Sequence, residues 1–146
     1  MDIYEAFLQV LNSNDPLKNL VGTRIFPDEL PEEEDDPEDP DKKIPIINGV
    51  TYQELPNGVD YTLKGKSIIR EIYQFDCWGR TNVEAKEIYK ALVSALDSFR
   101  GVYGNLNVQF SQQMTTAQKF HYPYNADKPD IIQHRYSTDY KFHYTK

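Results

Sequence analysis

The stretch from Lys66 to Gly101 constrains the fold most, because it joins one long strand pattern directly to one helix pattern. Residues Ser67 to Trp78 are rich in β-branched and aromatic types, contain no proline or glycine, and end at Gly79. This composition is typical of a strand and its terminator. Because side chains alternate along a strand, the more apolar face carries Ile69, Glu71, Tyr73, Phe75 and Cys77. We therefore expect a central strand with one face to bury.

A helix is predicted to begin at Thr81, almost directly after that strand. Thr81-Asn82-Val83-Glu84 is a capping box, in which the threonine hydroxyl accepts a backbone N–H and the glutamate reaches back. Apolar residues then recur at three- and four-residue spacing and form one stripe: Ala85, Ile88, Leu92, Ala95, Leu96 and Phe99. Gly101 predicts a left-handed cap at the helix end. The helix therefore has one face with which to cover the strand.

The remaining patterns complete a single domain over residues 1–146. They are a helix at 2–11, one further helical turn at 17–22, a short edge strand at 23–26, and strands at 44–55, 105–122 and 131–144. We expect the strand around Tyr52 to pair with the one around Tyr73. Asn48-Gly49 permits a hairpin or a bulge, and the short, Pro45-containing run before it favours the bulge. The predicted class is α+β, a mainly antiparallel sheet of about four to five strands with two helices on one face.

The net charge of −7 is concentrated in one segment. Residues 28–41 hold ten acidic side chains and no basic one, so the rest of the chain carries +3, the difference between −7 and −10. From about 28 to 43 the chain is proline-containing and nearly devoid of apolar residues, which predicts a mobile loop. The carboxylates at its centre belong to Glu32, Glu33, Glu34, Asp35, Asp36, Glu38 and Asp39. A solvated insertion and an electrostatic element that faces a partner are both open interpretations, whereas the glycine-containing spacing of a calcium loop is absent.

The sequence contains no catalytic motif, so we predict neither an enzyme nor a metal or other cofactor. His134 and His143 fall on opposite faces of the last strand, and His121 would neighbour His143 if the last two strands pair. Two histidines without a third ligand do not make a metal site. Cys77, in mid-strand, is most simply a small buried hydrophobe. No apolar run approaches the ~20 residues that span a bilayer, so we expect a soluble intracellular protein without a membrane partner.

Direct nucleic-acid binding is the main competing function. Near the C-terminus aromatic residues alternate with Arg135, Lys141, His143 and Lys146, which would suit stacking with phosphate contacts. The basic excess is small, however, and the dense anionic segment opposes binding at long range. A small nucleic-acid-binding regulatory module therefore stays open as the alternative.

Four segments carry a family resemblance: the N-terminal helix followed by Val21–Phe26, the strand Ile69–Trp78, the helix start Thr81–Ala85, and the closing Tyr136–Phe142. In type and order they resemble the tail completion, or tail terminator, proteins of long-tailed bacteriophages. The resemblance implies a structural virion protein that caps the tail tube as a hexameric ring, ends tube polymerisation and forms the tail side of the head–tail junction. It implies no catalysis. Another neck or head-completion adaptor is the nearest alternative.

The same resemblance implies partners and a location. The partners are further copies of the chain, the tail-tube protein and a head-completion or neck protein, while DNA passes through the ring lumen without specific binding. Assembly in the host cytoplasm and a place at the head–tail interface of the virion follow. In such a ring the acidic segment could face the lumen and repel phosphate, or dock on a basic neighbour.

Contacts between subunits favour exposed aromatic residues, and a ring subunit offers one surface while receiving with another. The expected contact residues are Trp78, Tyr103, Tyr122, Tyr124 and His143. Packing within the subunit is the equally open alternative for each of them.

Overall fold

The computed structural model describes residues 1–56, 68–115, 118–125 and 128–146, and it confirms the predicted strand and helix at the centre of the chain. These are β5 (Ile69–Gly79) and α3 (Asn82–Asp97). The Thr81 hydroxyl accepts the Glu84 N–H at 3.1 Å, and the Glu84 carboxylate reaches back to the N–H of Arg80. The predicted glycine cap is wrong, because the helix already ends at Asp97, and Gly101 begins a strand instead.

Within the described residues, seven strands form one sheet in the order β1-β4-β5-β9-β7-β6, with β8 also paired to β9. Besides β5, the strands of this sheet are β1 (Ile25–Pro27), β4 (Gly49–Leu55), β6 (Gly101–Tyr103), β7 (Leu106–Gln113), β8 (Gln118–Asn125) and β9 (Lys128–Thr145). The α+β class is confirmed, but the prediction of four to five strands is wrong. The sheet is also mixed, because β1 runs parallel to β4 and the other pairs are antiparallel.

The number of strands was predicted too low mainly because β9 is long enough to pair with two strands along one side. β7 pairs with the C-terminal part of β9, between Tyr140 and Thr145. β8 pairs with its N-terminal part, between Lys128 and Ser137. The stretch predicted as one strand at 105–122 is therefore two strands that lie end to end along a single partner. On its other side, β9 pairs with all eleven residues of β5.

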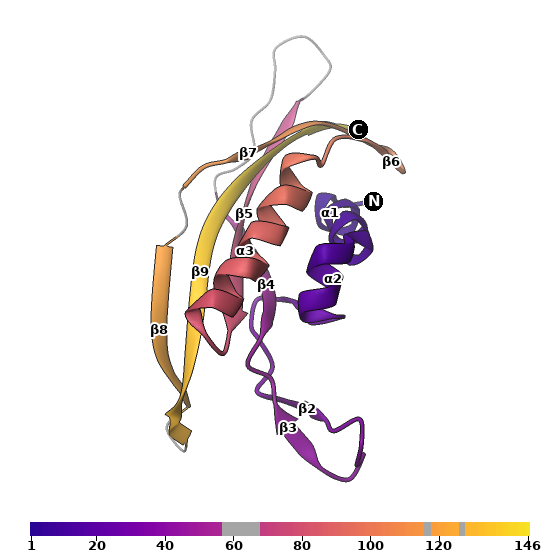
Figure 1. Cartoon of the computed structure of the whole chain (residues 1–146). Helices are drawn as coiled ribbons and strands as arrows, with labels where there is room; N and C mark the ends of the chain where they lie inside the picture. Colours follow the sequence, from indigo (N-terminus) through magenta and orange to yellow (C-terminus); the bar gives the residue numbers. More distant parts are fainter. Residues whose placement is uncertain (57–67, 116–117, 126–127) are drawn as a thin grey trace.

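The described helices all lie on one side of the curled sheet (Figure 1). α1 (Ile3–Ser13) and α2 (Asp15–Val21) are separated by Asn14, whose side chain accepts the Leu17 N–H at 3.0 Å and so caps α2. The turn predicted at 17–22 is thus a full helix, and the described residues contain three helices where two were expected. Together with α3 they bury one face of the sheet.

The core is built on aromatic rings from the alternating, helix-facing positions of β5 and β9. Phe7 of α1 packs against Tyr73, Phe75 and Phe142 with ring centroids 5.1–5.5 Å apart. Tyr140 is fully buried, and its hydroxyl donates to the Asp97 carboxylate at the end of α3 at 3.2 Å. The predicted apolar faces of both strands are therefore confirmed.

The predicted pairing of the strands around Tyr52 and Tyr73 is also confirmed, whereas the tip between them lies outside the described residues. Neither a hairpin nor a bulge forms at Asn48-Gly49. Gly49 instead begins β4, and a Cβ placed there would lie 2.9 Å from the Arg24 carbonyl oxygen and 2.9 Å from Leu30 Cδ1. Position 49 requires glycine because the backbone at Arg24, which leads into β1, passes too close to leave room for a Cβ atom.

Within the acidic segment, β2 (Glu33–Asp35) and β3 (Lys43–Pro45) pair antiparallel and form a separate two-stranded ribbon. This ribbon projects from the body of the domain, below α2 in Figure 1. The predicted mobility of the segment stays a prediction. β2 nevertheless lies where no regular structure was expected, and β3 overlaps the start of the strand predicted at 44–55.

Candidate interaction surfaces

The predicted contact residues do not form one cluster. Trp78 and His143 lie on the sheet face turned away from the helices, whereas Tyr103 lies on the edge strand β6 and Tyr122 and Tyr124 lie on β8. The side chains of Tyr122 and Tyr124 are outside the described part of the structure. A contact role stays a prediction for all five.

Three of these side chains have contacts within the subunit. The Trp78 indole N–H donates to the Thr51 hydroxyl at 3.0 Å. The His143 ring is buried, stacks on Phe110 with centroids 3.9 Å apart, and accepts a hydrogen bond from Arg70 Nε at 3.2 Å. Tyr103 packs on Phe99 and donates its hydroxyl to the Arg100 carbonyl. These contacts hold the rings in place.

The histidines are arranged differently from the prediction. The β8–β9 register places His121 opposite His134, so the expected pairing of His121 with His143 is wrong. The cause is again that β8 pairs with the N-terminal part of β9. In the described residues no three histidine, cysteine or acidic side chains gather as a metal-ligand set, and no helix is long and apolar enough to cross a membrane.

The sheet face opposite the helices, here called the open face, carries a connected set of polar groups. The Gln74 amide donates to Asp76 at 3.2 Å and to Ser137 at 3.1 Å. Arg135 lies 3.8 Å from the Asp76 carboxylate, and its guanidinium stacks over the rings of Trp78 and Phe120 at 5.4 and 4.5 Å. Cation–π stacking of this kind holds the guanidinium against the two rings.

A shallow hollow of about 170 Å³ lies within the open face. Its lining residues are Gln74, Thr115, Phe120, Arg135, Ser137 and Asp139. Partial burial, and to a lesser extent the neighbouring Asp76 carboxylate, raises the pKa of Asp139. Phe120, which lines the hollow, is 37% exposed, and Phe110, which stacks on His143 further along the same face, is 46% exposed. The face thus presents aromatic rings and an arginine, which are residue types enriched at protein interfaces.

The acidic ribbon, residues 28–45, is fixed at its base by one arginine. Arg24 binds the Glu34 carboxylate through two nitrogens and donates to the Asn48 side-chain oxygen at 2.7 Å. Further along, Lys43 pairs with Asp35, and this hydrogen bond raises the pKa of the lysine. Arg24 was not predicted as a site residue, although a lone arginine shortly before a run of carboxylates was a usable signal.

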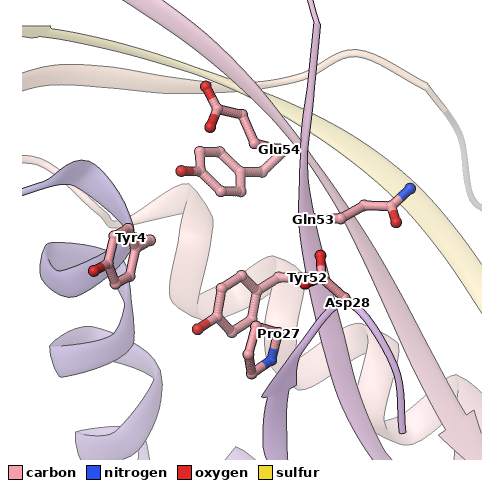
Figure 2. Close-up of a pocket in the computed structure, with 7 residues that line it drawn as sticks. Tyr4, Pro27, Asp28, Tyr52, Gln53 and Glu54 are labelled. Carbon is pink, nitrogen blue, oxygen red and sulfur yellow. The ribbon is translucent and has the colours of Figure 1, made fainter.

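A second hollow, here called the tyrosine pocket, lies between the start of α1, the end of β1 and the strands β4 and β5 (Figure 2). Its volume is about 300 Å³, and its lining residues are Tyr4, Pro27, Asp28, Tyr52, Gln53, Glu54 and Tyr73. Figure 2 shows the Tyr4 ring of α1 across the pocket from the Tyr52 ring of β4. Sequence reasoning missed this pocket because its residues come from four separate elements.

The tyrosine pocket is negatively polarised. Burial raises the pKa of Tyr52, and the neighbouring Tyr4 and Asp28 add to the shift. Burial also raises the pKa of Tyr73 well above its usual range, and Glu54, Glu71 and Asp2 add to it. These residues hold no nucleophile beside a base, so the arrangement suits binding rather than acid–base chemistry.

Comparison with known proteins is informative at the level of fold. No protein-family model matches the chain, and no curated protein matches its sequence. Among solved structures it is similar to a chain of the "Virion of native gene transfer agent (GTA) particle", with a TM-score of 0.66. The similarity covers 97% of this chain and 93% of that chain at 14% identity. At that identity, the likeness establishes a shared fold.

Proposed function

We propose that this chain is a structural protein of a phage-like virion that caps the tail tube as a ring, ends tube polymerisation and forms the tail side of the head–tail junction. The observation that carries the proposal is the fold shared, over nearly the whole of both chains, with a component of a gene transfer agent virion. It supports the proposal because the sequence independently resembles phage tail completion proteins. The proposed role is structural and involves no catalysis.

The distribution of surfaces supports assembly into a ring. A ring subunit makes heterologous contacts and so needs two different surfaces. The open face offers aromatic rings around Arg135, and the acidic ribbon offers a projecting anionic arm held by Arg24. Neither surface is covered by the described helices (Figure 1). Six copies, the tail-tube protein and a neck protein are the proposed partners, with DNA passing through the lumen unbound.

The direct test mixes the purified chain with the tail-tube protein of the virion to which it is proposed to belong. Electron microscopy would measure the length distribution of the tubes and look for extra density at one end, and light scattering would give the stoichiometry. We expect shorter tubes with a ring-shaped cap. Tubes of unchanged length, together with a monomer that is retained on DNA, would overturn the proposal in favour of a nucleic-acid-binding module.

A double variant tests the open face. Replacing Phe110 and Phe120 with serine removes two exposed rings, and Val83→Ser on the helix side is the matched control because Val83 is also exposed. We expect the double variant to stay folded and to lose tube capping, while the control caps normally. Normal capping by the double variant would remove the open face from the proposed interface.

A third variant tests the acidic ribbon without disturbing its base. Glu33→Gln, Glu38→Gln and Asp41→Asn remove three negative charges and keep the Arg24–Glu34 contact. A lumen-facing ribbon predicts caps that form but retain DNA, because phosphate repulsion is weaker. A ribbon that docks on a basic neighbour predicts weaker ring formation. Unchanged assembly, head joining and DNA passage would contradict both roles.

A further inference from the structure

We propose that the tyrosine pocket is a receptor for the side chain of a lysine or arginine on another polypeptide chain. This inference goes beyond the proposed function and does not depend on it, because it concerns the chemistry of one pocket. It rests on the walls of the pocket, on its charge and on its size.

The walls are aromatic and two of them are held rigidly. Tyr52 and Tyr73 are buried, and each packs edge-to-face against Phe7, with ring centroids 5.3 and 5.1 Å away. Tyr4, at the first turn of α1, closes the opposite side and is 37% exposed. Tyrosine rings attract ammonium and guanidinium groups through their electron-rich faces. Rings that cannot turn away lose little freedom when a cation enters.

The pocket carries carboxylates at its rim and no compensating cation among the described residues that line it. Glu54 lies on β4 beside the tyrosines, and Asp28 directly follows β1. The backbone N–H of Asp28 donates to the Tyr52 carbonyl at 2.8 Å, and its φ of 64° is a left-handed conformation that aspartate tolerates. This bond holds the Asp28 backbone against the strand that carries one of the rings.

The same charge excludes other ligand classes. An anionic group would be repelled by Glu54 and Asp28, and a neutral apolar group would desolvate the carboxylates without compensation. The volume of about 300 Å³ is at the lower limit of small-molecule sites, which run from ~300 to 1,000 Å³. It therefore suits one long side chain, with its aliphatic stem against the rings and its cationic end toward the carboxylates at the rim.

The test uses three capped tripeptides added to the intact chain at low salt. They are acetyl-Gly-Arg-Gly-amide, its lysine counterpart, and the citrulline peptide, which has nearly the shape of arginine without its charge. NMR would follow the ring protons of Tyr4 and Tyr52. We expect saturable shifts with the arginine and lysine peptides and none with citrulline. Comparison of the two cationic peptides tells which side chain the pocket prefers.

Two variants and one control locate the binding. Glu54→Gln and Tyr4→Ala should each weaken the arginine peptide about two- to five-fold, the range expected for one exposed cation–π or ionic contact. Glu87→Gln, an exposed carboxylate on α3, removes an equal charge and should leave the affinity unchanged. Circular dichroism would verify the fold of each variant, and Asp28→Asn would replace any variant that fails to fold.

Three outcomes would overturn the inference. They are equal shifts with the citrulline peptide, the absence of saturable shifts with either cationic peptide, and an affinity for the arginine peptide that neither Glu54→Gln nor Tyr4→Ala changes. None of these outcomes bears on tube capping, so the inference and the proposed function can fail separately.

Discussion

On β5 and β9, successive side chains alternate between two environments that are stabilised in different ways. The helix-covered face holds rings such as Phe75 and Phe142, which are fully buried and touch other rings. The open face holds Gln74, Trp78 and Arg135, which are half-buried and satisfied by hydrogen bonds and ring stacking. Burial of a ring is worth about 1.5–3 kcal/mol, whereas an exposed ion pair is worth about 0–1 kcal/mol. The covered face should therefore contribute more to stability than the open face.

The sharpest test of this contrast compares two phenylalanines on opposite faces. Phe142→Ala should lower the free energy of unfolding by about 3–5 kcal/mol, because it empties a space among Phe7, Phe75, Phe99 and Tyr140. Urea titration followed by circular dichroism would measure the loss. Phe110→Ala, on the open face, is the control and should cost less than about 1 kcal/mol. Equal losses would show that the open face contributes as much stability as the core.

Arg135 tests whether the open face is more than a solvated surface. Arg135→Ala removes the stack between Trp78 and Phe120 and the contact with Asp76, and should cost about 1–2 kcal/mol. Arg135→Lys keeps the charge but loses the planar stack, so it should recover less than half of the loss. Full recovery by lysine would mean that charge, and not stacking, holds the residue. Thermal and urea unfolding would both report the difference.

The cap of the covering helix should have an intermediate effect. Thr81→Ala leaves the Glu84 N–H without its hydroxyl acceptor and should cost about 1 kcal/mol. Thr81→Ser retains the acceptor and should be nearly neutral. Hydrogen exchange at the amides of residues 83–85 would locate the effect to the first turn of α3. Equal behaviour of the alanine and serine variants would contradict the capping role.

Much of the covered face could be predicted from sequence because its signals are local. Alternation along β5 and β9 and the threonine cap of α3 depend on neighbours in the chain, and all three were predicted correctly. The division of residues 105–122 into β7 and β8 was missed, since it depends on the length of β9, a distant partner. The parallel pairing of β1 with β4 and the requirement for glycine at position 49 were also missed. Both depend on the segment around Arg24 lying against the start of β4, which the alternation of side chains does not reveal.

The surfaces were less predictable than the core. Trp78 was predicted as a contact residue from its aromatic type, whereas its contacts with Thr51 and Arg135 involve other strands and could not be predicted from neighbouring sequence. The tyrosine pocket was missed entirely, because Tyr52 and Tyr73 appear in sequence as ordinary core aromatics. They line a pocket only because α1 and the end of β1 pack beside β4 and β5. A site assembled from several elements has no local pattern by which to recognise it.

Substitution of Glu71 should have the smallest effect on stability. It is also the only one of these substitutions expected to raise stability, because Glu71 is a carboxylate on the covered face. Partial burial raises its pKa above the ordinary value of about 4.5, although the Tyr144 hydroxyl donates to it and Lys146 lies near. A raised pKa in the folded state means that folding favours the protonated form. Glu71 therefore contributes stability at pH values below its ordinary pKa, and this contribution is lost as the pH rises through its pKa in the folded state.

Glu71→Gln should remove this loss, since glutamine does not ionise and can still accept the hydrogen bond from Tyr144. We expect the variant to be more stable than the natural chain at pH 7 and to differ little from it at pH 3.5. Urea unfolding at several pH values would measure the difference, and Glu87→Gln on the exposed side of α3 controls for the loss of one charge. A difference that is independent of pH would mean that packing, and not ionisation, sets the cost of this residue. The covered face would then tolerate a carboxylate as readily as the open face does.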